Sequence, residues 1–450
     1  MQMLDHDVPG GPAFTIRSLR DKVARADIAT EFGIVHRVSD QIVRAGLRHV
    51  AIGDQVSIRS SRSAAGISAE VIAIEGTTAI LSTHRPPVGV SEGARVVPRH
   101  GELSIEVGDW LLGRVVDGFG KPLDGQKDGV GDGVTRTVSL RGAPQRPLDR
   151  PMISDVMPTG VRVIDGLLTV GEGQRIGVFG SPGTGKTSLI GAIARQSRAD
   201  VVVLGLVGER GREVRDFIDR VLTKDMRDRI VVVASTSDRP AMERVYAART
   251  ATAIAEGFRD DGRRVLLIVD SLTRVARALR EIGLAAGEPP TRRGFPASVY
   301  PALPALIERA GTSADGTITA IYTLLTENDG EGDPIAEEVR SLTDGHIVLS
   351  RKLAEAARYP AIDVLGSLSR VMREIVDEDH LKHSAVVRGH LAKYDEIELL
   401  LQVGELKDGQ DPDADAARAA FPDIRAFCKQ PETEASGFED TLSWLGRVAR

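Results

Sequence analysis

Hydrophobic residues recur in short runs over the first quarter of the chain. Between Ile28 and Val97 the runs FGIVHRV, QVSIR, SAEVIAI and TAILS are interrupted by Gly, Asp and Ser. Turn signals come about every 8 to 12 residues, which is the spacing of strands in small all-β domains. This region is therefore predicted to fold as a small closed β-barrel.

A different pattern begins near Arg175. Continuous apolar runs alternate with stretches of helical periodicity, the apolar runs being RIGVF, DVVVLGLV, RIVVVAS and RRVLLIVD. Strands that are apolar on both faces and separated by helices are typical of a parallel sheet covered by helices. We expect an α/β domain here.

After about residue 378 the chain becomes helical in pattern and rich in charge, as in HLKHSAVVRGHLAKYDEIELLLQVGEL. The expected division is an N-terminal tail (1–27), a β-barrel domain (28–97), an α/β core (98–378) and a helical C-terminal domain (379–450). A chain of 450 residues is too long for a single core, in agreement with several domains.

Composition narrows the classes of function. The net charge of −6 provides no overall basic field for nucleic acid, so no nucleic-acid partner is expected. The one cysteine, Cys428, leaves no internal disulfide and fits a reducing compartment. No apolar run approaches the roughly 18 residues of a membrane span. Residues 14–27 could form a short basic amphipathic helix, and two interpretations are open: a frayed polar tail, or contact with an anionic membrane surface.

The segment GSPGTGKT matches the phosphate-loop pattern G-x-x-x-x-G-K-[ST] between an expected strand and an expected helix. Its backbone N–H groups would curl around phosphate oxygens, the lysine would reach the terminal phosphates, and the helix N-terminus would add its dipole. A nucleotide such as ATP is the expected ligand. The residues expected to bind it are Gly180, Ser181, Pro182, Gly183, Thr184, Gly185, Lys186, Thr187 and Ser188.

Asp270 ends the apolar run RRVLLIVD, and parallel sheets bind ligands at the carboxyl ends of their strands. Its carboxylate could hold Mg²⁺ together with the hydroxyl of Thr187. The alternative is that Asp270 caps the helix that follows.

Glu209 follows the apolar run VVVLGLV in the same way. A carboxylate at that edge could orient the water that attacks a terminal phosphate. From the residues alone, a structural role is equally open. Glu213 falls in the first turn of the next helix, where an acid favours the helix dipole.

Four stretches together resemble the type III secretion ATPases, which are relatives of the rotary ATP synthase alpha and beta subunits. They are GSPGTGKT, GERGREV, LLIVDSLTRVARALREIGLAAGEPPTRRGFP and DPIAEEVRSLTDGHIVLSRKLAEAARYPAIDVLGSLSRVM. The resemblance extends from about residue 28 to the C-terminus. It implies a β-barrel N-domain, a RecA-like P-loop ATPase core, a helical C-domain and a ring of six identical subunits.

The resemblance also implies roles for single residues. Glu209, in GER, would be the catalytic glutamate, and Arg210 beside it would contact phosphate or the active-site network. Arg370, in SLSRVM, would be an arginine finger that reaches into the neighbouring subunit's site. Tyr359, in ARYPAID, would pack on the adenine, and a core aromatic is the competing interpretation.

The function implied is an Mg²⁺-dependent ATPase that drives chaperone release, unfolding and export of secreted proteins. Expected partners are a central stalk protein, a stator or regulator, and chaperone–substrate complexes. The expected location is cytoplasmic, peripheral to the inner face of the bacterial inner membrane. Within the family, the sequences of these stretches resemble injectisome enzymes more closely than flagellar ones. A flagellar export ATPase and a rotary ATP synthase beta-type subunit are the alternatives.

Overall fold

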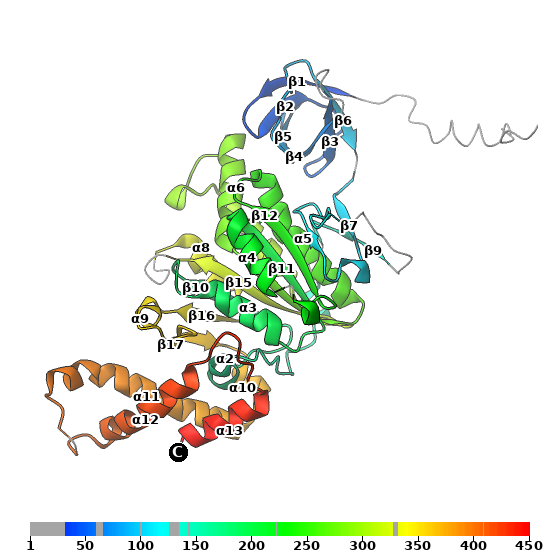
Figure 1. Cartoon of the computed structure of the whole chain (residues 1–450). Helices are drawn as coiled ribbons and strands as arrows, with labels where there is room; N and C mark the ends of the chain where they lie inside the picture. Colours follow the sequence, from blue (N-terminus) through cyan, green and yellow to red (C-terminus); the bar gives the residue numbers. More distant parts are fainter. Residues whose placement is uncertain are drawn as a thin grey trace, which may run out of the picture.

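Three parts follow one another along the molecule: a closed barrel at one end, an α/β core in the middle and a set of helices at the other end (Figure 1). The computed structural model describes residues 32–59, 66–99, 101–125, 135–142, 145–221, 223–326, 332–407 and 409–450. Residues 14–27, for which an amphipathic helix and a frayed polar tail are the two open interpretations, lie outside these ranges.

The N-terminal part is a closed six-stranded antiparallel barrel, in the order β1-β2-β5-β4-β3-β6. Every second side chain turns inward, as strand geometry requires, and the interior is filled mainly by small β-branched residues. This confirms the barrel predicted from the short apolar runs. Its strands are β1 (Gly33–Val38), β2 (Ile42–Gly46), β3 (Gln55–Arg59), β4 (Ile67–Glu75), β5 (Thr78–Thr83) and β6 (Arg95–Arg99).

The core is built on one sheet in the order β17-β16-β10-β15-β13-β11-β12-β8, with β14 (Gly311–Thr312) added beside β15. Its pairs from β16 to β8 are parallel, and β17 joins the edge in the antiparallel direction. The strands are β8 (Val115–Val116), β10 (Arg175–Gly180), β11 (Val201–Glu209), β12 (Ile230–Thr236), β13 (Arg264–Asp270), β15 (Thr317–Leu325), β16 (Gly345–Leu349) and β17 (Ile362–Ser369).

Helices cover both faces of this sheet, so its central strands are buried on both sides, as the continuous apolar runs predicted. One face carries α5, whose contact with β11 is close because a Cβ added at Gly205 would lie 3.0 Å from the Cβ of Ala251. A small two-stranded sheet, β7 (Ser104–Val107) with β9 (Arg136–Ser139), lies beside α5. The helices of the core are α2 (Arg162–Leu167), α3 (Lys186–Gln196), α4 (Gly211–Val221), α5 (Ala241–Asp260), α6 (Leu272–Ala286), α7 (Val299–Ile307), α8 (Pro334–Leu342) and α9 (Arg351–Glu355).

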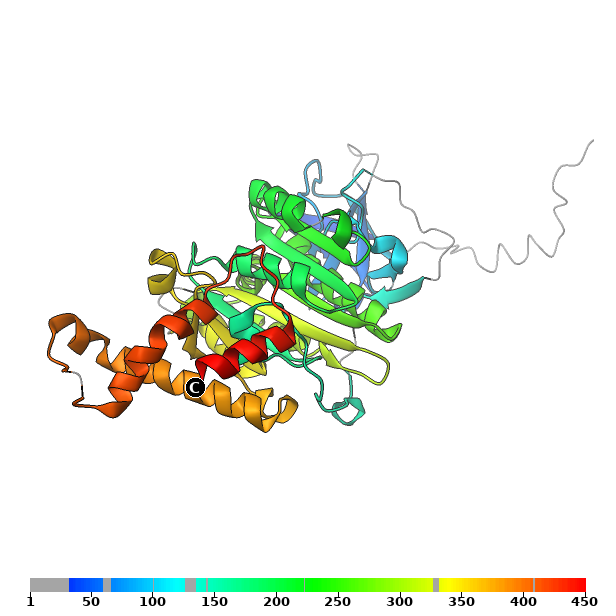
Figure 2. The same ribbon diagram turned by 60° about the horizontal axis from the view of Figure 1, so that its bottom comes forward.

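The C-terminal part is helical, as predicted, with α10 (Met372–Ile375), α11 (Glu378–Val403), α12 (Pro412–Cys428) and α13 (Phe438–Val448). Aspartates begin the two longest helices of this part: the side chain of Asp377 accepts from a first-turn N–H of α11, and that of Asp411 does so for α12. Between α11 and α12 the rings of Tyr394 and Phe421 stack at 3.5 Å. The far ends of these two helices project away from the core (Figure 2).

A buried polar cluster joins the barrel to the core. Glu70 of β4 accepts hydrogen bonds from the hydroxyl of Tyr246 on α5 and from Arg141. Beside them His84 stacks on Phe119, and burial lowers the pKa of His84 to about 4. The imidazole of His84 is therefore neutral at pH 7, so it packs between the barrel and α5 without adding a positive charge to the Glu70–Arg141 pair.

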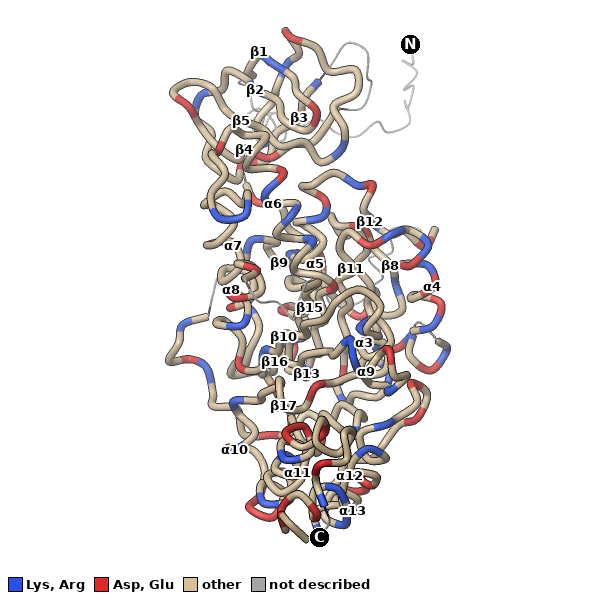
Figure 3. Tube along the Cα trace, turned by 90° about the vertical axis from the view of Figure 1, so that its left-hand side faces the viewer, with Lys and Arg blue, Asp and Glu red and all other residues tan. Residues whose placement is uncertain are grey.

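Basic and acidic residues are interspersed over all three parts of the molecule (Figure 3). On α4, for example, Arg212 pairs with Asp216 and Arg215 with Asp219, each one helical turn apart. Within the described ranges, no helix is long and apolar enough to cross a membrane.

Candidate active site

The phosphate loop connects the end of β10 at Gly180 to the start of α3 at Lys186. Gly183 and Gly185 have φ angles of 84° and 86°, a conformation that side chains other than glycine's rarely adopt. The hydroxyl of Thr184 donates to the carbonyl of Ser181 at 2.8 Å and closes the loop on itself. The motif therefore has the strand–loop–helix setting that phosphate binding requires.

Lys186 begins α3 and is almost completely buried. Its Nζ lies 3.7 Å from Oδ1 of Asp270 and has no hydrogen-bond partner among the described residues. Burial lowers the pKa of Lys186, while the charges of Asp270 and Glu209 act in the opposite direction. A buried ammonium group without a hydrogen-bond acceptor is costly, and a phosphate oxygen would satisfy it.

Asp270 is the last residue of β13, and its carboxylate accepts a hydrogen bond from the hydroxyl of Thr323 on the neighbouring strand β15. The helix that follows starts with Ser271 as its N-cap residue. The interpretation of Asp270 as a helix cap is therefore wrong. Its side chain instead lies at the ligand edge of the sheet beside Lys186.

Glu209 is the last residue of β11, the strand next to β13. Its Oε2 lies 3.4 Å from Nη2 of Arg274, which comes from the first turn of α6. Burial raises the pKa of Glu209, and the negative charge of Asp270 raises it further. Three charged groups predicted from separate motifs, Lys186, Glu209 and Asp270, are thus brought to one edge of the sheet.

Thr187 and Ser188 occupy the first turn of α3, with Thr187 exposed to solvent at the mouth of the loop. A hydroxyl and the nearby carboxylate of Asp270 are oxygen donors, which suit Mg²⁺, a cation that takes few protein ligands and otherwise phosphate oxygens and water. No cluster of three or more His, Cys, Asp or Glu side chains is poised for a metal in the described part of the chain. The donor set fits a nucleotide-borne cation.

A pocket of about 460 Å³ opens beside the phosphate loop. The ring of Tyr359 lines it and packs on the phosphate loop, since a Cβ added at Gly185 would lie 3.1 Å from that ring. Tyr359 is 43% exposed, so the competing interpretation as a core aromatic is wrong. Apolar side chains form most of the remaining walls: Val161, Leu189, Ala192, Pro360 and Pro431. The pocket suits a flat, largely apolar group such as a nucleobase.

The opposite wall is the segment 429–434, between α12 and α13 of the C-terminal part. The N–H of Gln430 donates to the carbonyl of Tyr359 at 3.0 Å, and its side-chain amide donates to the carbonyl of Gly160 at 2.8 Å. The buried guanidinium of Arg162 ties down the same segment by donating to the carbonyl of Lys429 and to the carboxylate of Glu434. The helical C-terminal part thus completes the pocket.

Two residues predicted from the resemblance lie elsewhere. The side chain of Arg210 is 80% exposed and its nearest acid is Glu213, with Nη1 3.7 Å from Oε1. Arg370 follows β17, and its N–H bonds to the carbonyl of Asp344. The structure therefore does not bring either guanidinium to Lys186 within the subunit.

The position of Arg370 follows from the sheet. Asp344 donates its N–H to the carbonyl of Arg175, the first residue of β10. Arg370, Asp344 and Arg175 therefore lie at the same end of the parallel strands, the amino end. The phosphate loop starts at Gly180, at the carboxyl end of the same strand β10. The five residue steps from Arg175 to Gly180, of about 3.3 Å each, separate the two ends of the strand by roughly 16 Å. This distance exceeds the reach of an arginine side chain.

Sequence reasoning missed three parts of the site: Arg274, Thr323 and the segment 429–434. Arg274 carried a usable signal, because it lies in the first helical turn after the strand-ending Asp270. Thr323 is one threonine among several in a buried strand, and segment 429–434 has no motif.

Fold and site together define a P-loop ATPase with the three-part architecture of rotary ATP synthase subunits. The family model "ATP synthase alpha/beta family, nucleotide-binding domain" matches residues 160–369, and "T3SS EscN ATPase C-terminal domain" matches residues 376–447.

Among curated relatives, the type 3 secretion system ATPase of Sinorhizobium fredii is 47% identical over 96% of this chain and 95% of its own length. That of Xanthomonas euvesicatoria is 48% identical over 96% and 97%. The flagellum-specific ATP synthase of Bacillus subtilis is 43% identical over 95% and 98%.

Two solved structures agree with this result. The assembled ATPase EscN of the enteropathogenic E. coli type III secretion system superimposes with a TM-score of 0.87 at 44% identity, covering 93% of this chain and 100% of that one. EscN in complex with its central stalk EscO gives a TM-score of 0.84 at the same identity and coverage. The chain belongs to the type 3 secretion system ATPases, and it is an ATP hydrolase.

Proposed function

We propose that this ATPase couples ATP hydrolysis at the interfaces between subunits to chaperone release, unfolding and export of secreted proteins. The observation that carries the proposal is the separation of Arg370 from the phosphate loop of its own subunit. The two lie at opposite ends of the parallel strands. A site built this way holds its phosphate-binding and water-orienting groups in one subunit. Its arginine finger then comes from the next.

The described side chains divide the work in the following way. The backbone of the phosphate loop and Lys186 bind the phosphates, and the pocket between Tyr359 and segment 429–434 takes the adenine. Glu209 orients the attacking water, with Arg274 holding its carboxylate in place. Arg370 of the neighbouring subunit stabilises negative charge on the transferred phosphoryl group, and Arg210 at the exposed rim contacts phosphate or its surroundings.

Mg²⁺ is the proposed cofactor, held with the nucleotide by the Thr187 hydroxyl and the Asp270 carboxylate. When bound, it neutralises charge on the phosphate oxygens. The hydroxyl of Thr323 orients the Asp270 carboxylate for this task by donating to one of its oxygens.

The proposed assembly is a ring of six identical subunits with a central stalk protein in its pore and a stator or regulator beside it. EscN is assembled in one structure and bound to the stalk EscO in another, which supports self-assembly and a stalk partner for this relative. Chaperone–substrate complexes would dock on the projecting ends of α11 and α12, where α11 exposes Leu399 and Val403. We place the ring in the cytoplasm, peripheral to the inner face of the bacterial inner membrane, without a nucleic-acid partner.

A flagellar export ATPase is the second candidate, favoured by the 43% identity to the Bacillus subtilis enzyme. The chemistry at the nucleotide would be the same, and the export partners would differ. Purification of the tagged protein from its host, followed by identification of the stalk and chaperones that accompany it, separates the two systems.

The decisive test of the interface mechanism is complementation. Arg370→Ala and Glu209→Gln should each be nearly inactive, since fingers contribute roughly 10³ to 10⁵ in rate in well-studied P-loop enzymes. Rings mixed from the two variants contain some interfaces with both groups intact and should regain activity. A mixing series at fixed total protein, with ring formation checked by light scattering, measures this. Full activity of a verified monomer, or mixed rings inactive at every ratio, would reject the proposal.

A further inference from the structure

Arg370 has a firmly held backbone and a free side chain. Its N–H donates to the carbonyl of Asp344 at 2.9 Å. The next residue, Val371, packs against Gly171, where an added Cβ would lie 3.4 Å from a Val371 methyl group. The guanidinium itself is exposed and makes no hydrogen bond or ion pair with any described residue. This combination suits a group that acts on another subunit.

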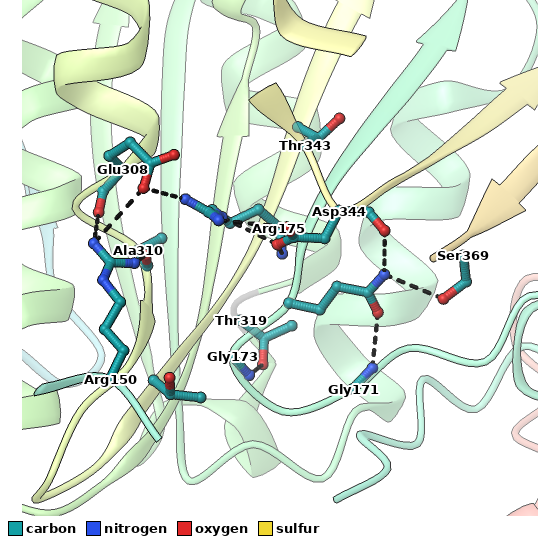
Figure 4. Close-up of polar contacts among 12 residues, drawn as sticks. Arg150, Gly171, Gly173, Arg175, Glu308, Ala310, Thr319, Thr343, Asp344 and Ser369 are labelled. Carbon is teal, nitrogen blue, oxygen red and sulfur yellow. Dashed lines mark hydrogen bonds and ion pairs between the residues drawn. The ribbon is translucent and has the colours of Figure 1, made fainter. Parts of the chain in front are cut away.

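A single fully buried glutamine, Gln174, lies at the centre of this support. Its Nε2 donates to the carbonyl of Asp344 at 3.0 Å and to Oγ of Ser369 at 3.1 Å, and its Oε1 accepts from the N–H of Gly171 at 2.9 Å. Figure 4 shows Gly171, Asp344 and Ser369 converging on one amide. The hydroxyl of Ser369 donates a hydrogen bond to the carbonyl of Thr169 at 2.8 Å.

Asp344 is also held from its other side. Its carboxylate accepts from Nε of Arg175 at 3.1 Å, and Nη1 of Arg175 lies 2.6 Å from the carboxylate of Glu308 (Figure 4). Arg150 joins the same chain of contacts by donating to the carbonyl of Glu308. Ion pairs thus anchor Asp344, and the Gln174 amide connects Asp344 to Ser369, the last residue of β17.

We propose that Gln174 is a positioning residue for Arg370. Its amide fixes the point at which the Arg370 side chain leaves the subunit, and so sets how the guanidinium meets the neighbour's nucleotide. The inference rests on the proposed trans role of Arg370. It also joins two sites, because Gln174 directly precedes β10 and the other end of β10 is the phosphate loop.

The expected effect of losing the amide follows from the topology. β17 is the edge strand of the sheet and pairs with β16 alone among the described strands. Its last residue, Ser369, pairs with Gly345 on that side, so its other side is held by side-chain contacts. Without Gln174, Ser369 and the Asp344 carbonyl each lose a donor. A displacement of about 1 Å in a group that stabilises a transition state can cost on the order of 100-fold in rate.

The test uses the full-length chain and Gln174→Met, which keeps the shape of the side chain and removes its hydrogen bonds. We expect kcat to fall roughly 10- to 100-fold while KM for ATP changes less than about 3-fold. In the Arg370→Ala background the same substitution should cause no further loss of kcat. Mixed rings of Gln174→Met with Glu209→Gln should regain activity, since the defect acts in the neighbour's site.

Two controls keep the result interpretable. Gln55→Met removes another buried glutamine, whose amide bonds within the barrel, and should leave kcat near normal. Ser369→Ala deletes only one partner of the Gln174 amide and should lower kcat in the same direction by less, so it serves as the test if Gln174→Met does not fold.

The positioning role is overturned if Gln174→Met and Arg370→Ala lower kcat multiplicatively in the double variant. It is equally overturned if Gln174→Met fails to complement Glu209→Gln while Arg370→Ala succeeds. If Arg370→Ala itself fails to complement Glu209→Gln, the trans mechanism falls, and the positioning role falls with it.

Discussion

The Nζ of Lys186 lies 3.7 Å from Oδ1 of Asp270, and both side chains are more than nine-tenths buried. The distance is too long for a hydrogen bond, so the ammonium keeps its donors for another acceptor. Lys186 begins α3 and Asp270 ends β13, two elements that are far apart in the sequence. Their proximity places a cation that can contact phosphate oxygens beside an anion that can contact their counter-ion.

Lys186→Ala and Glu209→Gln should separate binding from turnover. The first removes the cation that contacts phosphate and should strongly weaken ATP binding. The second keeps the size and polarity of the side chain, so the variant should still bind ATP while kcat falls by about 10²-fold or more. Equilibrium binding of a fluorescent ATP analogue and steady-state kinetics measure the two effects. A Glu209→Gln enzyme with near-normal kcat would contradict the assignment.

The raised pKa of Glu209 predicts an acid limb in the pH profile of kcat. Orienting water requires the ionised carboxylate, so activity should fall as the pH drops through the folded-state pKa, above the ordinary glutamate value of about 4.3. Burial and the charge of Asp270 are the causes. The residual activity of Glu209→Gln should lack this limb; an unchanged limb would assign it to another group.

The same pKa shift makes a prediction about stability. A carboxyl whose folded pKa is raised binds more protons in the folded state, so stability falls as the pH rises from the unfolded to the folded pKa. At neutral pH the ionised Glu209 therefore destabilises the fold. Glu209→Gln should raise Tm at pH 7 relative to the parent, and the difference should shrink at acid pH. Thermal unfolding at two pH values checks this, and a lower Tm at pH 7 would contradict it.

Tyr359 should contribute mainly to binding of the base. Tyr359→Ala is expected to raise KM for ATP about 5- to 150-fold, because aromatic stacking on a base contributes about 1–3 kcal/mol. Tyr359→Phe keeps the ring and should stay close to the parent. Inhibition by tripolyphosphate, which lacks a base, should be the same for all three proteins. A parallel loss of tripolyphosphate binding would place the defect at the phosphate loop instead.

The base pocket should discriminate weakly between ATP and GTP. Two polar side chains of its wall are engaged with the protein: the amide of Gln430 bonds Gly160 and the N–H of Arg162, while the Glu432 carboxylate pairs with Arg195. The buried Oε1 of Gln196 is a lining acceptor without a hydrogen-bond partner among the described residues. Sites that rely on shape and apolar contact discriminate by about 10- to 200-fold, far less than sites that hydrogen-bond the distinguishing group. We expect kcat/KM for the two nucleotides to differ by less than about 100-fold. A difference of 10⁴-fold would mean that a side chain reads the base.

The barrel, the parallel sheet and the phosphate loop could be predicted because each depends on residues close together in the chain. Alternation over a few residues decides which face of a strand is buried, and Gly183, Gly185 and Lys186 sit within one loop. The shared edge of Glu209 and Asp270 also followed from the sequence, because the carboxyl ends of parallel strands always meet at one side of a sheet. Arg210 stays a prediction, with its side chain in solvent.

The sequence by itself therefore determined the elements, their polarity and the identity of the phosphate loop. Only the tertiary structure decided which distant groups meet: Arg274 with Glu209, Thr323 with Asp270, and Gln430 with the main chain of Tyr359. It also placed Arg370 and Gln174 at the edge away from the phosphate loop. The physical reason is that local preferences act over a few residues, whereas these contacts depend on the order of strands in the sheet. In that order β10 lies between β15 and β16, strands that come more than a hundred residues later in the chain.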